Sequence, residues 1–188
     1  MSAVIAYIIE IILLLWVAKI IFNFIRAIVL RVRFYVKFEK LCTEKGYSIT
    51  KNRNLFASFF CVSKKADFIL CAGGTRYSVR LLTCFAHKRA YHFINESCYI
   101  RFARFGYILP MSKNINKIRF FESIKKMPLL AREQGDVPKQ ILLLNPSPAE
   151  VFQLEGNRMK KSLVRDGAEM YGWNVYSAKG FLDLLGGI

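Results

Sequence analysis

Hydrophobic positions are distributed very unevenly along the chain, and the first segment is almost entirely apolar. Residues 3–24 have the sequence AVIAYIIEIILLLWVAKIIFNF, which puts apolar side chains on every face of a helix. At about 1.5 Å per residue this helix reaches about 30 Å, the thickness of a bilayer's hydrocarbon core. Lys19 can snorkel to one interface, and Glu10 lies a turn or two from the other. The pattern therefore predicts a transmembrane anchor over residues 1–25.

A cleaved signal peptide is the main alternative for this segment. It needs a positively charged start, a shorter apolar core and a small-residue cleavage site. The two residues before the apolar run carry no charge, and residues 23–26 contain no A-x-A site. A retained anchor fits the sequence better.

After the anchor the pattern becomes amphipathic. Between residues 26 and 46, Phe34, Phe38 and Leu41 form an apolar stripe at helical spacing, and Gly46 supplies a C-terminal stop. We expect one basic juxtamembrane helix over residues 26–46 that packs into a single domain over residues 47–188, a length that supports one core.

The domain itself is predicted to be α/β. Strand-like runs occupy residues 55–62, 66–72, 75–83, 101–107, 140–144 and 173–177, and helical patterns occupy residues 113–126 and 180–185. Gly73 and Gly74 separate two of these runs and are typical of a two-residue hairpin turn.

The register of this hairpin can be predicted from its turn. Asp67 then faces Arg80, and Ile69 faces Ser78. One face of the hairpin carries the predicted core residues Phe68, Leu70, Tyr77, Val79 and Leu81, whereas the other carries the polar residues Asp67, Arg76, Ser78 and Arg80.

The charge distribution predicts how the anchor is oriented. No Lys or Arg precedes the span, and the basic residues Arg26, Arg31, Arg33 and Lys37 follow it directly, where we expect them to lie at the membrane surface. The positive-inside rule therefore places the N-terminus outside the cell membrane and the C-terminal domain in the cytosol. The five cysteines are odd in number and lack C-x-x-C pairing, which is typical of reduced thiols.

Most of the net charge of +16 lies in the first part of the domain. Residues 24–132 contain 22 Lys and Arg against 5 Asp and Glu. Such a basic field attracts anionic lipid headgroups or nucleic acid phosphates. The candidate polyanion-binding residues lie beyond the juxtamembrane helix: Arg101, Arg104, Lys113, Lys117, Arg119, Lys125 and Lys126.

The segment ADFILCAGGTRYSVRLLTC, residues 66–84, resembles the core of the PD-(D/E)XK, or restriction-endonuclease-like, nuclease superfamily. Members place an Asp at the start of the second strand and a Glu-x-Lys on the third. Asp67 matches the Asp, and Ser78-Val79-Arg80 stands in place of Glu-x-Lys. The resemblance implies a mixed sheet with flanking helices, closed by the predicted strand at 173–177 and helix at 180–185.

The resemblance also implies a degenerate catalytic site at Asp67, Ser78 and Arg80. In the superfamily, carboxylates hold Mg²⁺, which requires oxygen ligands. Ser78 does not replace the missing carboxylate, and Arg80 is a poor proton-transfer group because it stays charged. Asp67 remains the metal-ligand candidate, and a second carboxylate would have to come from Glu39 or Glu44. Otherwise Asp67 and Arg80 form a cross-strand ion pair and no cofactor is needed.

Other chemistry has weaker support in the sequence. Cys84, His87, His92 and Cys98 include zinc-ligand types, but their spacing matches no standard finger. No P-loop, G-x-S-x-G or dinucleotide fingerprint occurs.

Three functions remain open. The first is a membrane-tethered, catalytically inactive nuclease-like module that binds nucleic acid or another polyanion. The second is a membrane-surface protein-interaction module with its basic face on anionic lipid. The third is a Mg²⁺-dependent nuclease with a rearranged acidic site.

Overall fold

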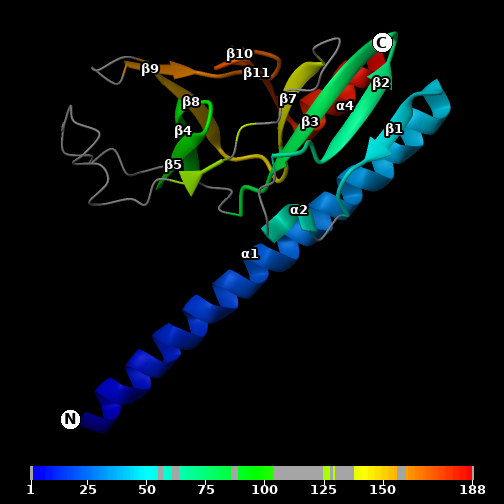
Figure 1. Ribbon diagram of the computed structural model, residues 1–188. Helices are drawn as coiled ribbons and strands as arrows, with labels where there is room; N and C mark the ends of the chain where they lie inside the picture. Colours follow the sequence, from blue (N-terminus) through cyan, green and yellow to red (C-terminus); the bar gives the residue numbers. More distant parts are fainter. Residues whose placement is uncertain are drawn as a thin grey trace.

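One long helix and two β-sheets account for most of the chain (Figure 1). The computed structural model describes residues 2–54, 57–60, 64–85, 89–103, 125–127, 129, 138–155 and 160–187. Within this part the protein is a mixed α/β structure with one apolar N-terminal helix.

The helix α1 (Ser2–Lys45) joins the predicted anchor and the predicted juxtamembrane helix without a break. Its first half projects away from the sheets and is exposed on all sides (Figure 1). Of the helices in the described ranges, α1 alone is long and apolar enough to cross a membrane. The predicted stop is confirmed, since Gly46 has a φ of 68° and the Tyr47 N–H donates to the Cys42 carbonyl at 2.8 Å.

Six strands form the first sheet, in the order β1-β2-β3-β7-β11-β10. Neighbouring pairs are antiparallel at β1/β2, β2/β3 and β10/β11, and parallel at β3/β7 and β7/β11. These strands are β1 (Ser48–Lys51), β2 (Phe68–Ala72), β3 (Thr75–Leu82), β7 (Lys139–Leu144), β10 (Glu169–Met170) and β11 (Trp173–Ser177).

The predicted hairpin register is confirmed in β2 and β3. Ile69 pairs with Ser78, and Phe68 pairs with Val79. Gly73 and Gly74 have φ angles of 54° and 74°, as a two-residue turn with the right twist requires.

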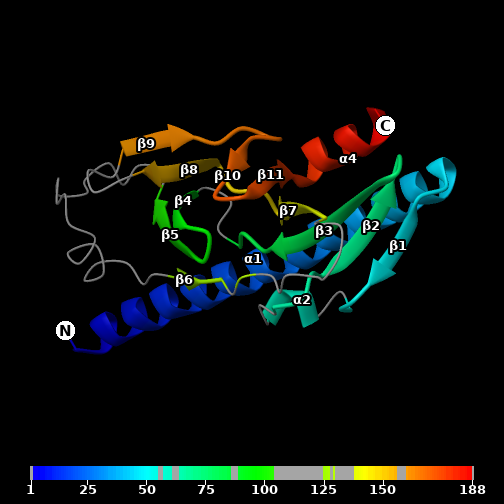
Figure 2. The same cartoon turned by 45° about the horizontal axis from the view of Figure 1, so that its top comes forward.

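The second sheet has the order β6-β5-β4-β8-β9. Its strands are β4 (Arg89–Asn95), β5 (Cys98–Ala103), β6 (Lys125–Lys126), β8 (Glu150–Glu155) and β9 (Lys160–Leu163). In Figures 1 and 2 this sheet lies beside the first, on the side of the domain nearer the N-terminal half of α1. Of the five strands in this sheet, the sequence pattern predicted part of one. The predicted strand covered residues 101–107, and residues 101–103 belong to β5.

The first sheet has a hydrophobic core on each face. On one face, Phe34 and Phe38 of α1 and Phe181 and Leu185 of α4 (Ala178–Gly187) pack against the predicted core residues of β2 and β3. On the other face, Leu142 and Trp173 pack with residues of the second sheet, including Tyr91, Phe93 and Val151. The hairpin face predicted to be polar is therefore largely covered.

Two predicted elements require correction. Residues 57–60 form the short helix α2 (Ala57–Phe60), not a strand, because the Asn54 side chain accepts the Ala57 N–H at 2.7 Å and starts a helical turn. The helix predicted over residues 113–126 lies outside the described residues except for its last two, which form strand β6.

The central position of Phe38 in the first core gives a stability prediction. Phe38 is fully buried, so Phe38→Ala should lower the unfolding free energy of the domain by about 3–5 kcal/mol. Urea unfolding in detergent micelles, followed by Trp173 fluorescence in a Trp16→Phe background, would measure this change. The exposed Lys37→Ala is the matched control and should change stability by less than about 0.5 kcal/mol. Equal effects of the two substitutions would show that this face of α1 does not pack in the core.

Candidate functional site

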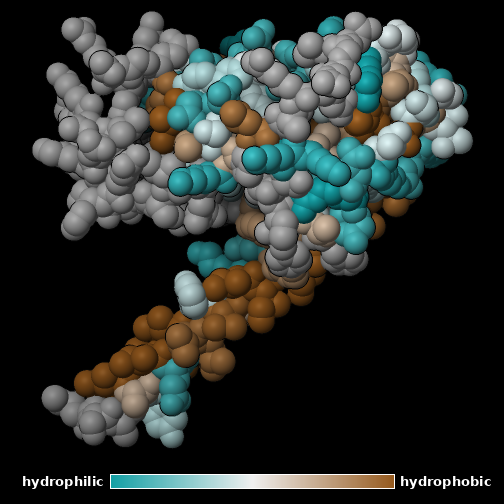
Figure 3. All heavy atoms as spheres, in the orientation of Figure 1, coloured by the Kyte–Doolittle hydropathy of each residue, from teal (hydrophilic) through white to brown (hydrophobic). Residues whose placement is uncertain are grey.

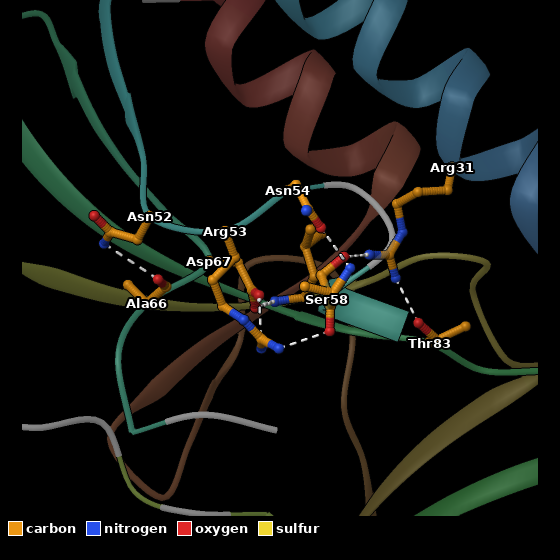
Figure 4. A network of polar contacts seen from close by, with 10 residues as sticks. Arg31, Asn52, Arg53, Asn54, Ser58, Ala66, Asp67 and Thr83 are labelled. Carbon is orange, nitrogen blue, oxygen red and sulfur yellow. Dashed lines mark hydrogen bonds and ion pairs between the residues drawn. The ribbon is translucent and has the colours of Figure 1, made fainter. Parts of the chain in front are cut away.

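Three arginine side chains, Arg53, Arg31 and Arg80, act electrostatically on Asp67. Figure 4 shows two of them, Arg31 and Arg53, in the polar network to which Asp67 belongs. Asp67 is 3% exposed, Arg31 is 0% exposed and Arg80 is 2% exposed. Arg53 is the third arginine and forms an ion pair with Asp67. The local surplus of positive charge is therefore largely buried.

Both carboxylate oxygens of Asp67 accept hydrogen bonds. The Arg53 Nη1 donates to Oδ1 at 3.3 Å, and the Leu81 N–H donates to Oδ2 at 2.8 Å. Burial raises the pKa of Asp67 above its ordinary value, while the Leu81 N–H and the arginines Arg53, Arg31 and Arg80 act in the opposite direction. A metal ion at this carboxylate would have to replace donors that are already in place.

Arg31 connects α1 to three other segments. Its Nη1 donates to the Ser58 Oγ at 2.8 Å, and its Nη2 donates to the Thr83 Oγ1 at 2.6 Å and to the Asn145 carbonyl at 2.9 Å. The guanidinium also lies 4.6 Å from the centre of the Phe59 ring. Burial lowers the pKa of Arg31. This side chain joins α1 to α2 and to the ends of β3 and β7.

The prediction that Arg31 lies at the membrane surface is therefore wrong. The residue faces the core because it shares a helical face with Phe34 and Phe38, three and seven positions further on. That spacing could have identified it. Of the other residues predicted at the membrane surface, Arg33 and Lys37 are exposed and Arg26 is half-buried.

Arg80 and Ser78 lie on the face of β3 that the second sheet helps to cover. Ser78 is buried, and the Arg80 guanidinium lies 5.3 Å from the centre of the Trp173 ring. Burial lowers the pKa of Arg80 to about 10, and Asp67 acts in the opposite direction. The sequence predicted a cross-strand ion pair between Asp67 and Arg80 as the alternative to a metal site. Both side chains are buried, and the ion pair that Asp67 forms is with Arg53.

The proposed second metal ligands are engaged elsewhere. Glu39 forms an ion pair with Lys51, and Glu44 forms one with Lys40 at 3.8 Å. Across the described ranges no group of three or more His, Cys, Asp or Glu side chains is placed to hold a metal ion. Glu39 and Glu44 therefore do not join Asp67 in such a group.

The same finding applies to the zinc candidates within the described ranges. Cys84 and His92 are buried, and the His92 ring stacks on Phe152 at 4.9 Å. Cys98 lies on β5, whereas His87 lies outside the described residues. Stacking in the second sheet gives His92 a structural role.

The predicted polyanion-binding residues are only partly described. Lys126 is exposed on β6. Arg101 and Lys125 lie on strands, but their side chains lie outside what is described. Arg104, Lys113, Lys117 and Arg119 lie outside the described residues. Two exposed basic residues that the analysis of the sequence missed, Lys64 and Lys65, follow α2 shortly along the chain.

A cluster of three aromatic rings lies where the projecting half of α1 meets the domain. The Phe24 ring lies 6.4 Å from Phe59 and 6.1 Å from Phe85, and Phe59 lies 6.3 Å from Phe85. The sequence pattern did not reveal this cluster, because its members come from three separate segments. Together with the Arg31 contacts, it fixes the position of the domain on α1.

The Arg31 contacts give a second stability prediction. Arg31→Lys keeps the charge but loses the planar fork that reaches three acceptors, so the unfolding free energy should fall by about 2–4 kcal/mol. Arg33→Lys, two positions along and exposed, is the control and should have an effect below about 0.5 kcal/mol. Urea unfolding of both variants would measure the difference, and a tolerated Arg31→Lys would contradict the proposed role of the fork.

His92 predicts a pH dependence of stability. Burial, helped by Lys161, lowers the pKa of His92 from 6.5 to about 4. Between these values the unfolded chain binds more protons than the folded one, so stability falls as the pH falls from 6.5 to about 4. The loss relative to His92→Gln should reach about 3 kcal/mol. Parallel urea unfolding curves for the two proteins at every pH would contradict the burial of this ring.

Comparisons with known proteins give no family to which the chain can be assigned. No family model, no curated protein and no solved structure matches it.

Proposed function

We propose that the protein is a single-pass, membrane-anchored module whose basic cytosolic domain binds nucleic acid or another polyanion near the membrane without cleaving it. The domain is a degenerate, catalytically inactive relative of the restriction-endonuclease-like fold. The observation that carries this proposal is the state of Asp67, which is buried and bound by Arg53 and the Leu81 N–H.

The anchor is supported by the contrast between the two halves of α1. The first half is apolar and exposed on all sides, and the second half packs in the core. An exposed apolar surface of this length is costly in water and suits a bilayer. The basic residues that follow it favour a cytosolic domain, and the free cysteines Cys42, Cys71, Cys84 and Cys98 are compatible with that compartment.

The order and pairing of the elements support a nuclease-like core. A helix precedes an antiparallel β1-β2-β3 unit, and β7 then joins β3 in parallel. Asp67 comes directly before β2, while Ser78 and Arg80 lie on β3, as the resemblance predicts. The second sheet is an addition to that pattern: its strands β4, β5 and β6 come between β3 and β7 in the chain, and its strands β8 and β9 follow β7.

The chemistry of the same site argues against catalysis. Mg²⁺-dependent hydrolysis needs oxygen ligands from more than one side chain. Glu39 and Glu44 are paired with lysines, and Ser78 is a neutral hydroxyl. Arg53 instead supplies the positive charge beside Asp67 that a metal ion would supply.

Binding to anionic lipid is the alternative use of the basic surface, and one observation favours it. Lys64 and Lys65 are exposed shortly after α2, and α2 packs through Phe59 against Phe24 and Arg31 of α1. These lysines therefore belong to the end of the domain from which the apolar half of α1 projects. Basic residues at that level are attracted to anionic headgroups by about 1 kcal/mol each.

The first test is a salt titration with the full chain in nanodiscs of neutral lipid. Fluorescently labelled duplex and single-stranded DNA and RNA would be titrated at several salt concentrations, with and without Mg²⁺. We expect binding whose log–log salt slope is several units, at about 0.9 per neutralised phosphate of duplex DNA, with the nucleic acid intact. Lys117→Glu with Arg119→Glu should flatten the slope, whereas Lys179→Glu on α4 is the exposed control.

Two results would contradict the proposal. Cleavage that requires Mg²⁺ and is lost in Asp67→Ala would make the protein a nuclease. Absence of nucleic-acid binding, together with binding of the domain to added anionic vesicles, would assign the basic surface to lipid.

A further inference from the structure

The second half of α1 carries an apolar stripe that faces away from the core. Ile25, Val29, Val32 and Val36 are 53%, 40%, 41% and 62% exposed. On the opposite side of the same helix, Ala27, Phe34, Phe38 and Cys42 are buried. The stripe is therefore not covered by the described part of the domain, although it lies on the segment that the domain holds.

The bilayer alone does not account for this stripe. From Val4 to Val36 the helix rises about 50 Å, while the hydrocarbon core is about 30 Å thick. Figure 3 shows hydrophobic surface over the projecting half of α1 and further along the lower edge of the helix beneath the domain. If the anchor fills the bilayer, the end of the stripe stands outside it.

The spacing of the stripe indicates what covers it. Its four members follow one another at intervals of four, three and four residues, which is the a/d spacing of a coiled coil. Continued from Ile25 toward the N-terminus, the same alternating intervals of three and four residues fall on apolar residues only: Phe22, Ala18, Leu15, Ile11, Ile8 and Val4. The charged residues of α1 between Val4 and Val36 all lie off this line. A surface that only faces lipid does not require apolar residues at this spacing, whereas a surface that packs on a second helix does. We call this line of residues from Val4 to Val36 the seam.

We propose that α1 pairs in parallel with α1 of a second copy of this chain, along the seam from Val4 to Val36. This contact is independent of the proposed polyanion binding, because it uses the opposite side of α1 from the domain. Insertion into one membrane in one orientation makes the two helices parallel, and the domains then lie on the outer sides of the pair.

The charges beside the seam fit this arrangement. In a parallel pair, the basic flanking residues Arg33 and Lys40 lie across from Ile28 and Tyr35 of the second copy, so no like charges meet. In an antiparallel pair the basic flank would face itself. The apolar seam and its basic flank thus select a parallel second copy over an antiparallel one.

Disulfide cross-linking tests the contact in the full chain. Val29→Cys, Val32→Cys and Val36→Cys would be compared with Lys37→Cys, an exposed residue off the seam, with the unchanged chain showing the background of the native cysteines. A disulfide needs Cα atoms within about 7 Å, so the seam positions should give about tenfold more cross-linked pair than Lys37→Cys. The samples would be nanodiscs or liposomes with a large excess of lipid.

A second measurement separates the contact from the fold of the domain. The double substitution Val32→Lys with Val36→Lys changes only exposed positions. The midpoint of urea unfolding of the domain in micelles should therefore stay the same. In liposomes, single-molecule photobleaching should show a shift from pairs to single copies. Equal cross-linking at seam and control positions, or single copies of the unchanged chain at every lipid ratio, would overturn the proposal. Pairs that survive the double substitution would also overturn it.

Discussion

The structure depends on a single helix whose two halves have different surroundings. The first half of α1 is apolar all round, which suits hydrocarbon, and the second half buries one face in the core of a water-exposed domain. Because the helix is continuous, the position of the domain relative to the apolar half of α1 is set by the contacts of α1. The Phe24–Phe59–Phe85 cluster and the Arg31 hydrogen bonds lie at that transition. The domain is thus built around the same helix that contains the candidate membrane span.

The same transition determines the electrostatics of the candidate site. Arg31, Arg53 and Arg80 surround one carboxylate, and their burial removes most of the solvent that would otherwise screen them. Asp67 has a structural role here, since it receives the Arg53 ion pair and the Leu81 N–H. In the function proposed above, Arg53 supplies the positive charge beside this carboxylate, and this ion pair is the physical basis for proposing binding without catalysis.

Local patterns predicted the parts of the fold that local physics decides. The Gly73-Gly74 turn and the alternation on both sides of it gave the β2–β3 register, and the apolar run of β7 and the final strand and helix were found at nearly their observed positions. The errors have tertiary causes. The aromatic run near Phe59 resembles a strand, but the Asn54 cap and the contact with α1 make it a helix. The pairing of β4 with β8 joins segments far apart in the sequence, and no local signal specifies it.

Hydrogen exchange on the full chain in nanodiscs tests most directly whether α1 belongs to both the membrane and the core. As denaturant is added, we expect the amides of residues 27–45 to lose protection in one step with β3 and β7, while residues 4–22 stay protected in the bilayer. If residues 27–45 opened at much lower denaturant than β3 and β7, the second half of α1 would be a tether and not part of the core.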